Sequence, residues 1–562
     1  MPAFSAKEII SIGTTIDILF YGDVRDTNVA AVPQPSPGSQ LRGEPTEFGL
    51  RILKDTLEAQ STFMTRFSVD VLLRHHKLKS DGFPEADARP GLNKLTPALL
   101  KKYDQVWFFG QQYANLRQWF DDYGGPDSEL TDAEVAALQS WMDAGGGVLI
   151  TGDHSNDVSF VEQHLVEPSL RGKTLNLGRA LGCRVPRAGE MRVWVGAPDA
   201  GPPSYYVDTA ADPNMGMMPK QEDAIPQSIR VEQVWRKVSL TGLNPLGISG
   251  YWWPEDHPLF RGRPTADYPS SRIDILPDHV HEGAINIPRS FDPSVWPRRG
   301  NFQATPQVVA WGTNKAPLRF GGLGGGLRDR FTLWREVGAV AAYDGDTVGV
   351  GRIVAHSTWH HFVNVNLVGF RNPDGTPGKV LRRLGEYFGN LALWLSPWAT
   401  RWRLWSALVA WTARHPLMRE VHGAPAPVVG DAAVGLLRSA IGEGMLADLA
   451  ELPFAAQQAE VQMARPTIPA GLLVGQSVID MQRRLVRDAC AQEAGIEHLV
   501  ASASAAAASH ADALAEAAAT LRQWAHCEVP GGKPRGHGGK GRSKGKEKEK
   551  EKETGKAKAK AS

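Results

Sequence analysis

LTDAEVAALQSWMDAGGGVLITGDH, residues 130–154, is the stretch of sequence that decides the fold. Thr-Asp-Ala-Glu at 131–134 has the spacing of a capping box and predicts the start of a helix. Apolar residues then recur at helical spacing until the glycines at 145–147, which predict the helix end. The apolar run that follows predicts a buried strand, and Asp153 and His154 come directly after it. Open α/β sheets place polar groups in this way at the carboxyl ends of their strands, where they bind ligands.

The rest of the sequence up to Pro397 repeats this alternation of short apolar runs and helical patterns, which predicts a βαβ architecture. A helix is expected over residues 48–61. The expected strands are residues 16–22, 68–74, 103–110, 148–152, 307–312, 337–343 and 351–367. We interpret the last three of these as strands that return to the sheet or form a hairpin beside it.

The composition divides the chain, which has 562 residues, into three regions. Residues 1–397 carry the α/β pattern, with an irregular stretch at about 185–250 that we interpret as an insertion. Residues 398–529 lack strand patterns and show apolar residues at helical spacing, so we expect a helical region. Residues 530–562, rich in Lys, Glu and Gly, have almost no apolar side chains and are expected to be disordered.

Charge and cysteine content exclude several classes of function. A formal net charge of +1 provides no general attraction to nucleic acid, so we expect no nucleic-acid partner. The 3 cysteines are too few and too widely spaced for a disulfide framework or a zinc ribbon, and they fit a reducing compartment. The N-terminus lacks the pattern of a signal peptide, and Pro397 interrupts the most apolar stretch. We therefore expect a cytoplasmic protein without a membrane span.

Polar side chains follow several of the expected strands. Because the carboxyl ends of parallel strands share one edge of a doubly wound sheet, we expect these side chains to converge there. They are Asp23, Arg25 and Asp26 after the first strand, Gln111 and Gln112 after the third, and Asp153 and His154 after the fourth. The alternative for Asp23 and Asp153 is that each caps a helix or forms an Asx turn.

A histidine-rich segment, STWHHFVNVN, lies within residues 351–367. If this segment is a strand, then His360, Asn364 and Asn366 share one face, and His361 lies on the other. Such a polar stripe is unusual in a buried strand and favours a ligand-facing side. The alternative is the exposed face of a hairpin.

A second cluster, PDHVHEG, offers His279, His281 and Glu282 as candidate metal ligands. Asp, His and Glu side chains together bind zinc or harder divalent ions. No HExxH or CxxC spacing accompanies them, so a divalent metal is an option that the sequence leaves open and the cofactor stays undetermined.

Several segments together resemble the class I glutamine amidotransferase-like superfamily, in its ThuA-like (trehalose-utilisation) branch. They are YDQVWFFG (103–110), residues 130–154, DHPLFRG (256–262) and GRIVAHSTWHH (351–361), within residues 16–395. The resemblance implies a flavodoxin-like three-layer α/β sandwich with a mostly parallel sheet. It also implies that His154 corresponds to the family's histidine after the glycine-rich strand, and His360 or His361 to its late histidine. The nucleophilic cysteine of true amidotransferases has no counterpart here, so we do not expect glutamine hydrolysis.

These observations predict a hydrolase-like enzyme that acts on a small polar or carbohydrate-like ligand. Asp153, His154 and His360 or His361 are the candidate acid–base residues. The candidate ligand-binding residues are Asp23, Arg25, Asp26, Gln111, Gln112, Asn364 and Asn366. The alternative is a non-catalytic ligand-sensing or scaffolding protein, in which the helical region forms a homo-oligomer or binds a protein partner.

Overall fold

The structure, a computed structural model, divides the chain into two units, residues 1–515 and 516–562. The part of the chain that it describes lies in the first unit: residues 13–22, 50–74, 76–78, 84–88, 93–109, 130–151, 184–194, 226–238, 251–277, 283–285, 287–317, 332–442, 444–446, 448–449, 452 and 470–487. The expected tail, residues 530–562, falls outside these ranges, as do residues 488–529 of the expected helical region.

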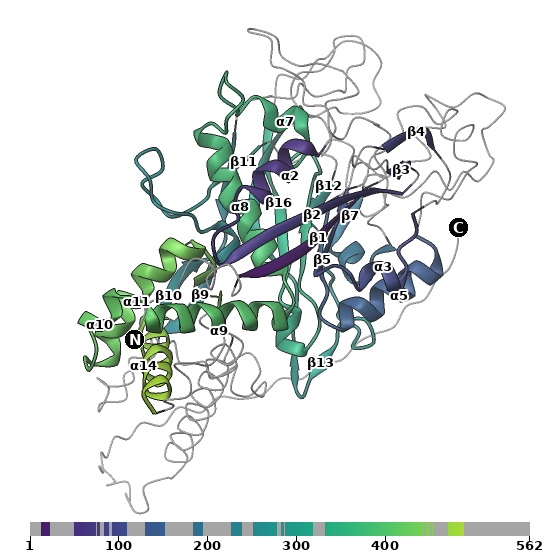
Figure 1. Cartoon of the computed structure of the whole chain (residues 1–562). Helices are drawn as coiled ribbons and strands as arrows, with labels where there is room; N and C mark the ends of the chain where they lie inside the picture. Colours follow the sequence, from purple (N-terminus) through teal and green to yellow (C-terminus); the bar gives the residue numbers. More distant parts are fainter. Residues whose placement is uncertain are drawn as a thin grey trace, which may run out of the picture. The chain divides into compact units, whose positions relative to one another are not determined.

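A mixed sheet of 9 strands forms the centre of the described fold (Figure 1). In their order across the sheet the strands are β11 (Ile275–Leu276), β8 (Gln227–Val231), β15 (Gln307–Pro317), β16 (Thr332–Tyr343), β17 (Ile353–His356), β6 (Gly147–Ile150), β5 (Gln105–Phe109), β1 (Thr14–Gly22) and β2 (Thr65–Leu73). From β17 to β2 the neighbours are parallel, and from β11 to β17 they are antiparallel. The expectation of a mostly parallel sheet is thus corrected to a mixed sheet with a parallel core.

Both faces of the parallel core are covered by helices. Successive side chains of a strand point to opposite faces, so Phe20 of β1 packs in one hydrophobic cluster and Leu19 in another. The covering helices are α2 (Arg51–Glu58) and α8 (Lys379–Leu395) on the face of Phe20, and α3 (Pro97–Leu100) and α5 (Asp132–Asp143) on the face of Leu19. Figure 1 shows α3 and α5 together, away from α2 and α8.

The predicted capping box at the start of α5 is confirmed. Thr131 accepts from the backbone N–H of Glu134, whose carboxylate accepts from the backbone N–H of Thr131. The same carboxylate is buried against the guanidinium of Arg74, at 2.6 Å, and accepts from the backbone N–H of Leu95. Burial raises the pKa of Glu134, but these hydrogen bonds, of which that from Arg74 is the strongest, lower it to about 2. One carboxylate therefore fixes the start of α5 to two other segments.

The predicted strand over residues 351–367 is wrong beyond His356, where β17 ends. Residues 357–363 form a turn, and α7 (Asn364–Val368) follows. The stretch at about 185–250, expected to be irregular, contributes β8 to the main sheet through antiparallel pairing with β15.

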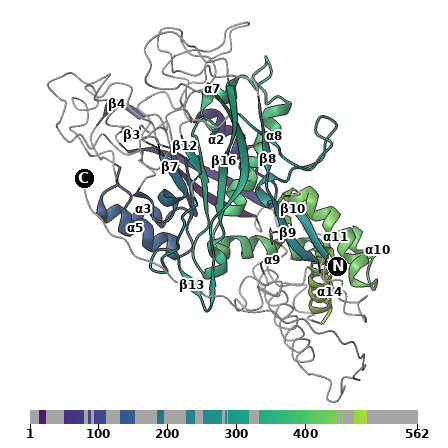
Figure 2. The same cartoon turned by 180° about the vertical axis from the view of Figure 1, so that it is seen from behind.

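Shorter elements surround the sheet. Figure 2 shows the opposite side, where β12 lies against β16. Within the described ranges, four pairs of strands lie outside the main sheet: β3 (His76–Leu78) with β4 (Pro84–Ala88), β7 (Arg192–Trp194) with β12 (Gly283–Ile285), β9 (Gln233–Val238) with β10 (Tyr251–Asp256), and β13 (Arg298–Arg299) with β14 (Phe302–Gln303). The 3-10 helices are η5 (Ala188–Met191), η7 (Pro258–Phe260) and η8 (Gly345–Val348).

After α8 the described chain is helical. The helices are α9 (Trp398–Arg414), α10 (Leu417–Glu420), α11 (Ala426–Ile441) and α14 (Ala470–Arg487). Side chains of α9, α11 and α14 belong to the same hydrophobic cluster as α8 and one face of the sheet. Within the described ranges, no helix combines the length and the apolar character needed to cross a bilayer.

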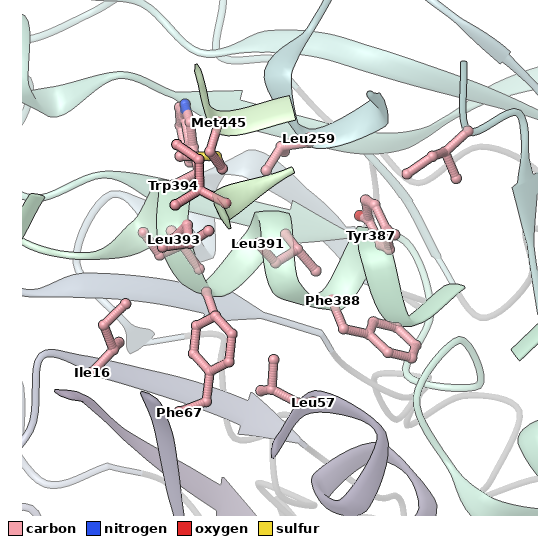
Figure 3. Close-up of a cluster of buried hydrophobic side chains, with 14 of the residues drawn as sticks. Ile16, Leu57, Phe67, Leu259, Tyr387, Phe388, Leu391, Leu393, Trp394 and Met445 are labelled. Carbon is pink, nitrogen blue, oxygen red and sulfur yellow. The ribbon is translucent and has the colours of Figure 1, made fainter. Parts of the chain in front are cut away.

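The helix α8 packs closely on the sheet. Figure 3 shows Tyr387, Leu391 and Trp394 of α8 in the buried cluster that also contains Ile16 of β1. At the end of the helix the approach is so close that a methyl group on Gly147 would lie 1.9 Å from the carbonyl oxygen of Leu395. No side chain other than hydrogen fits at this position of β6.

A buried ion network ties the helical region to the sheet. Asp448 pairs at 2.9 Å with Arg352, the residue directly before β17, and at 3.1 Å with Arg401 of α9. Arg401 also pairs with Asp346 of η8. Burial raises the pKa of Asp448, but the two guanidinium groups outweigh it and lower the pKa to about 2. All these groups are at least nine-tenths buried, so the pairs lie in a medium of low dielectric.

We expect Asp448→Asn to lower the free energy of unfolding at pH 7 by about 3–5 kcal/mol, because it removes one of the carboxylates that compensate the two buried guanidinium groups. The wild-type contribution of Asp448 is fully present above its unfolded pKa near 4 and is lost as the pH falls toward 2. Urea titrations of both proteins from pH 7 to pH 2 should therefore converge at the acid end. The control Asp55→Asn removes an exposed pair with Arg51 and should cost less than about 1 kcal/mol; an equal cost for both variants would contradict the role of burial.

Gly147→Ala should lower the free energy of unfolding by about 1–3 kcal/mol or more, because the new methyl group overpacks the contact between β6 and α8. Gly435 of α11 is the matched control, since a methyl group there would meet nothing within 4 Å. Gly435→Ala should raise stability by about 0.5–1 kcal/mol through helix propensity. Urea denaturation of the full chain measures both; a neutral Gly147→Ala would show that α8 does not sit against β6 as described.

Candidate functional site

The carboxyl ends of four parallel strands lie level with one another. Gly22, the last residue of β1, is in register with Phe109, the last residue of β5. Phe108 and Ala355 are both in register with Ile150, the last residue of β6. The loops that leave β1, β5, β6 and β17 therefore start from one edge of the sheet, which is where doubly wound sheets bind their ligands.

Most of the residues that were expected at this edge lie outside the described ranges. They are Asp23, Arg25, Asp26, Gln111, Gln112, Asp153 and His154, and the same holds for the candidate metal ligands His279, His281 and Glu282. In the sequence, Asp23 follows the last residue of β1 directly, and Asp153 comes two residues after Thr151. Thr151 continues β6, because its backbone N–H and its hydroxyl both donate to the carbonyl oxygen of Phe108. The proposed roles of these residues stay predictions.

At the end of β17 the structure places a chain of three hydrogen-bonding side chains. Nε2 of His356 lies 2.6 Å from the hydroxyl oxygen of Tyr387 in α8. Nδ1 of His356 lies 3.0 Å from Nδ1 of His361, which follows in the turn before α7. All three side chains are fully buried. The chain thus joins the last residue of a central strand to the helix that covers it.

Aromatic rings enclose this chain. The ring of Phe362 lies against His356, with 4.7 Å between centroids, and against Phe109 at the end of β5, with 5.7 Å. On the other side Phe260 of η7 stacks on Tyr387 at 5.1 Å. Polar groups in such surroundings depend on one another for hydrogen bonds, because burial without a partner is costly.

Burial raises the pKa of Tyr387 well above the ordinary value of a tyrosine. The phenol therefore keeps its hydrogen throughout the neutral and mildly alkaline range. Imidazole, in contrast, titrates near neutrality when unperturbed and serves as acid, base or hydrogen-bond donor. Two linked imidazoles beside a permanently protonated phenol form an arrangement that can hold or pass a proton.

The two adjacent histidines of the sequence have different surroundings. His361 belongs to the chain with His356 and Tyr387. The ring of His360 lies edge-on against Trp359, and its backbone N–H donates to the hydroxyl of Thr358. Of the two, His361 is therefore the one that the structure connects to the end of β17.

Asn364 and Asn366 are buried in α7 rather than aligned on a strand. The amide oxygen of Asn364 accepts from the backbone N–H of Ile52, in the first turn of α2, at 2.9 Å. It therefore satisfies a helix N-terminus that has no side-chain cap of its own. This contact gives Asn364 a structural role, and the predicted ligand contacts of both asparagines stay predictions.

No cluster of three or more His, Cys, Asp or Glu side chains suited to a metal ion occurs among the residues described. The separation of 3.0 Å between the Nδ1 atoms of His356 and His361 is that of a hydrogen bond. The proposed metal site at His279, His281 and Glu282 is not tested by these observations.

Sequence reasoning missed His356 and Tyr387. The rule that selected Asp153, a polar residue directly after a buried strand, also selects His356 once β17 is known to end there. The predicted strand ran on to residue 367 and hid this end. Tyr387 carries no local signal, because it meets His356 across 31 residues of sequence by the docking of α8.

No protein-family model matches the sequence, and no curated protein matches it. The function of this chain must therefore be inferred from its own residues and from the geometry of its fold.

Proposed function

We propose that this protein is a hydrolase-like enzyme that acts on a small polar substrate at the carboxyl edge of its parallel strands. In this proposal His361 contacts the substrate, and His356 and Tyr387 hold His361 in position through hydrogen bonds. The observation that carries the proposal is the buried, hydrogen-bonded chain of Tyr387, His356 and His361. Polar groups in a core are retained at a cost in stability, so a complete buried network calls for a reason beyond packing.

The position of the chain supports a catalytic role. In chain order, β1, β2, β5, β6 and β17 lie across the sheet as 2-1-3-4-5, the order of flavodoxin-like folds, whose ligands bind beyond the carboxyl ends of the strands. His356 is the last residue of the fifth of these strands. The neighbouring strand, β6, leads in the sequence to Asp153 and His154, which we retain as the second pair of acid–base candidates.

The contacts around Tyr387 also support the proposed relationship to the amidotransferase-like superfamily. Phe260 belongs to DHPLFRG and His356 to GRIVAHSTWHH, two of the segments that carry the resemblance, and both contact Tyr387. Segments about 100 residues apart in sequence thus meet around one side chain. Without the nucleophilic cysteine, the proposed chemistry is acid–base hydrolysis rather than glutamine hydrolysis.

The test is hydrolysis of a panel of p-nitrophenyl esters, glycosides and phosphates by the full-length chain between pH 5 and pH 9. We expect turnover of at least one class, and we expect His361→Asn to lower kcat/KM by about 100- to 10,000-fold, as loss of a general acid or of an oxyanion-stabilising donor does. Asparagine keeps an acceptor near the position of Nδ1 and removes Nε2, so the contact to His356 can persist.

Tyr343→Phe is the matched control. Tyr343 is buried at the end of β16, and its hydroxyl has no hydrogen-bond partner within the described residues. The control should keep wild-type kcat/KM. Full activity of folded His361→Asn would overturn the proposal. Thermal stabilisation of the wild type by a panel compound that it never hydrolyses would favour the ligand-sensing alternative.

A further inference from the structure

The hydrogen bond between the two histidines has a direction. It joins Nδ1 of His356 to Nδ1 of His361, and only one of these atoms carries the hydrogen when both rings are neutral. This choice also decides, for each ring, whether Nε2 carries a hydrogen. Whatever fixes one tautomer in this chain therefore fixes both.

Tyr387 supplies one such constraint. Its hydroxyl is fully buried, and His356 is its polar partner among the residues that the structure describes. Its ring contacts the rings of Phe260 and Phe388, neither of which accepts a conventional hydrogen bond. If His356 donated to Tyr387, the hydrogen of the phenol would have no acceptor, which disfavours that direction by a factor of about 5 to 150. Tyr387 is therefore the donor and Nε2 of His356 the acceptor.

The remaining protons follow from this bond. His356 accepts at Nε2, so its hydrogen is on Nδ1, and it donates to Nδ1 of His361. His361 then accepts at Nδ1 and carries its own hydrogen on Nε2. A group that meets Nε2 of His361, from a substrate or from the protein itself, must be a hydrogen-bond acceptor.

We propose that Tyr387 is a positioning residue that sets the tautomers of His356 and His361, so that His361 offers an Nε2 N–H to an acceptor oxygen of the substrate, such as a carbonyl, a carboxylate or a developing oxyanion. The part that concerns the substrate rests on the proposed function. The part that concerns the tautomers rests on the geometry of the three side chains alone.

Tyr387 keeps its role as hydrogen-bond donor at mildly alkaline pH. Because burial raises the pKa of Tyr387, the phenol remains a donor at pH 7 to 9. A neutral imidazole held as an N–H donor can polarise a carbonyl or stabilise negative charge on oxygen without carrying a positive charge itself. This role differs from that of a histidine whose Nδ1 donates to a carboxylate and whose Nε2 acts as a base.

The experiment is nitrogen NMR of the full-length chain labelled with ¹⁵N in its histidine rings, at pH 8. Two further variants, His356→Asn and His361→Asn, assign the signals of the two rings. For the wild type we expect the Nδ1–H tautomer at His356 and the Nε2–H tautomer at His361. In Tyr387→Phe the ratio of the Nδ1–H to the Nε2–H tautomer of His356 should fall at least about fivefold. In the control Tyr343→Phe this ratio should not change.

Each result decides the inference. An Nε2–H tautomer at wild-type His356, or tautomers that Tyr387→Phe leaves unchanged, would overturn it. The wild-type spectrum is decisive even if Tyr387→Phe does not fold. Failure of the proposed function is distinguishable, because the expected tautomers together with full activity of His361→Asn would leave the positioning role of Tyr387 intact and remove only the substrate contact.

Discussion

The docking of α8 on the parallel strands is the constraint on which the rest of the structure depends. At one end of the contact, Arg352 donates to the carbonyl oxygen of Trp394, and four residues further along the strand His356 meets Tyr387. Four steps along the strand, from Arg352 to His356, span about 13 Å. Seven steps along the helix, from Trp394 to Tyr387, span about 10 Å. The two lengths are similar, so one rigid placement of α8 satisfies both contacts. A displacement of α8 by a single turn would separate Tyr387 from His356. The histidine chain is therefore a consequence of helix packing.

The amino edge of the sheet holds this placement. Gly147 permits the close approach of α8, and Gln105 of the neighbouring strand donates from its side chain to the carbonyl oxygen of Ala392. His257 lies beside the same end of the helix, with its ring against Trp394. Burial and the positive charge of Arg352 lower the pKa of His257 to about 3, so its imidazole is neutral and its Nδ1 can accept the backbone N–H of Leu259. The ion network of Asp448 thus lies at the amino edge of the sheet and the histidine chain at the carboxyl edge.

Local patterns predicted those parts of the fold that depend on local chemistry. The capping box at Thr131 and the strand that ends at Ile150 follow from residues within a few positions of each other, and both are present. The end of β17 and the helix at Asn364 depend on distant partners, because Asn364 caps α2 across 312 residues. The strand β8, in a stretch expected to be an insertion, likewise exists through its pairing with β15. Two of the three side chains in the hydrogen-bonded chain, His356 and Tyr387, come together in this second way, and their contact could not be derived from spacing.

Two kinds of buried polar group occur in this molecule, and the difference bears on function. Arg74 and Glu134 are buried together, and their bonds hold backbone groups at the start of α5, so their structural value is evident. Asn364 serves α2 in the same manner. The hydrogen bonds that run from Tyr387 through His356 to His361 join side chains to side chains. Apolar residues of similar volume could fill that space at lower cost. This difference supports the proposal that the network at the carboxyl edge of the parallel strands has a chemical role.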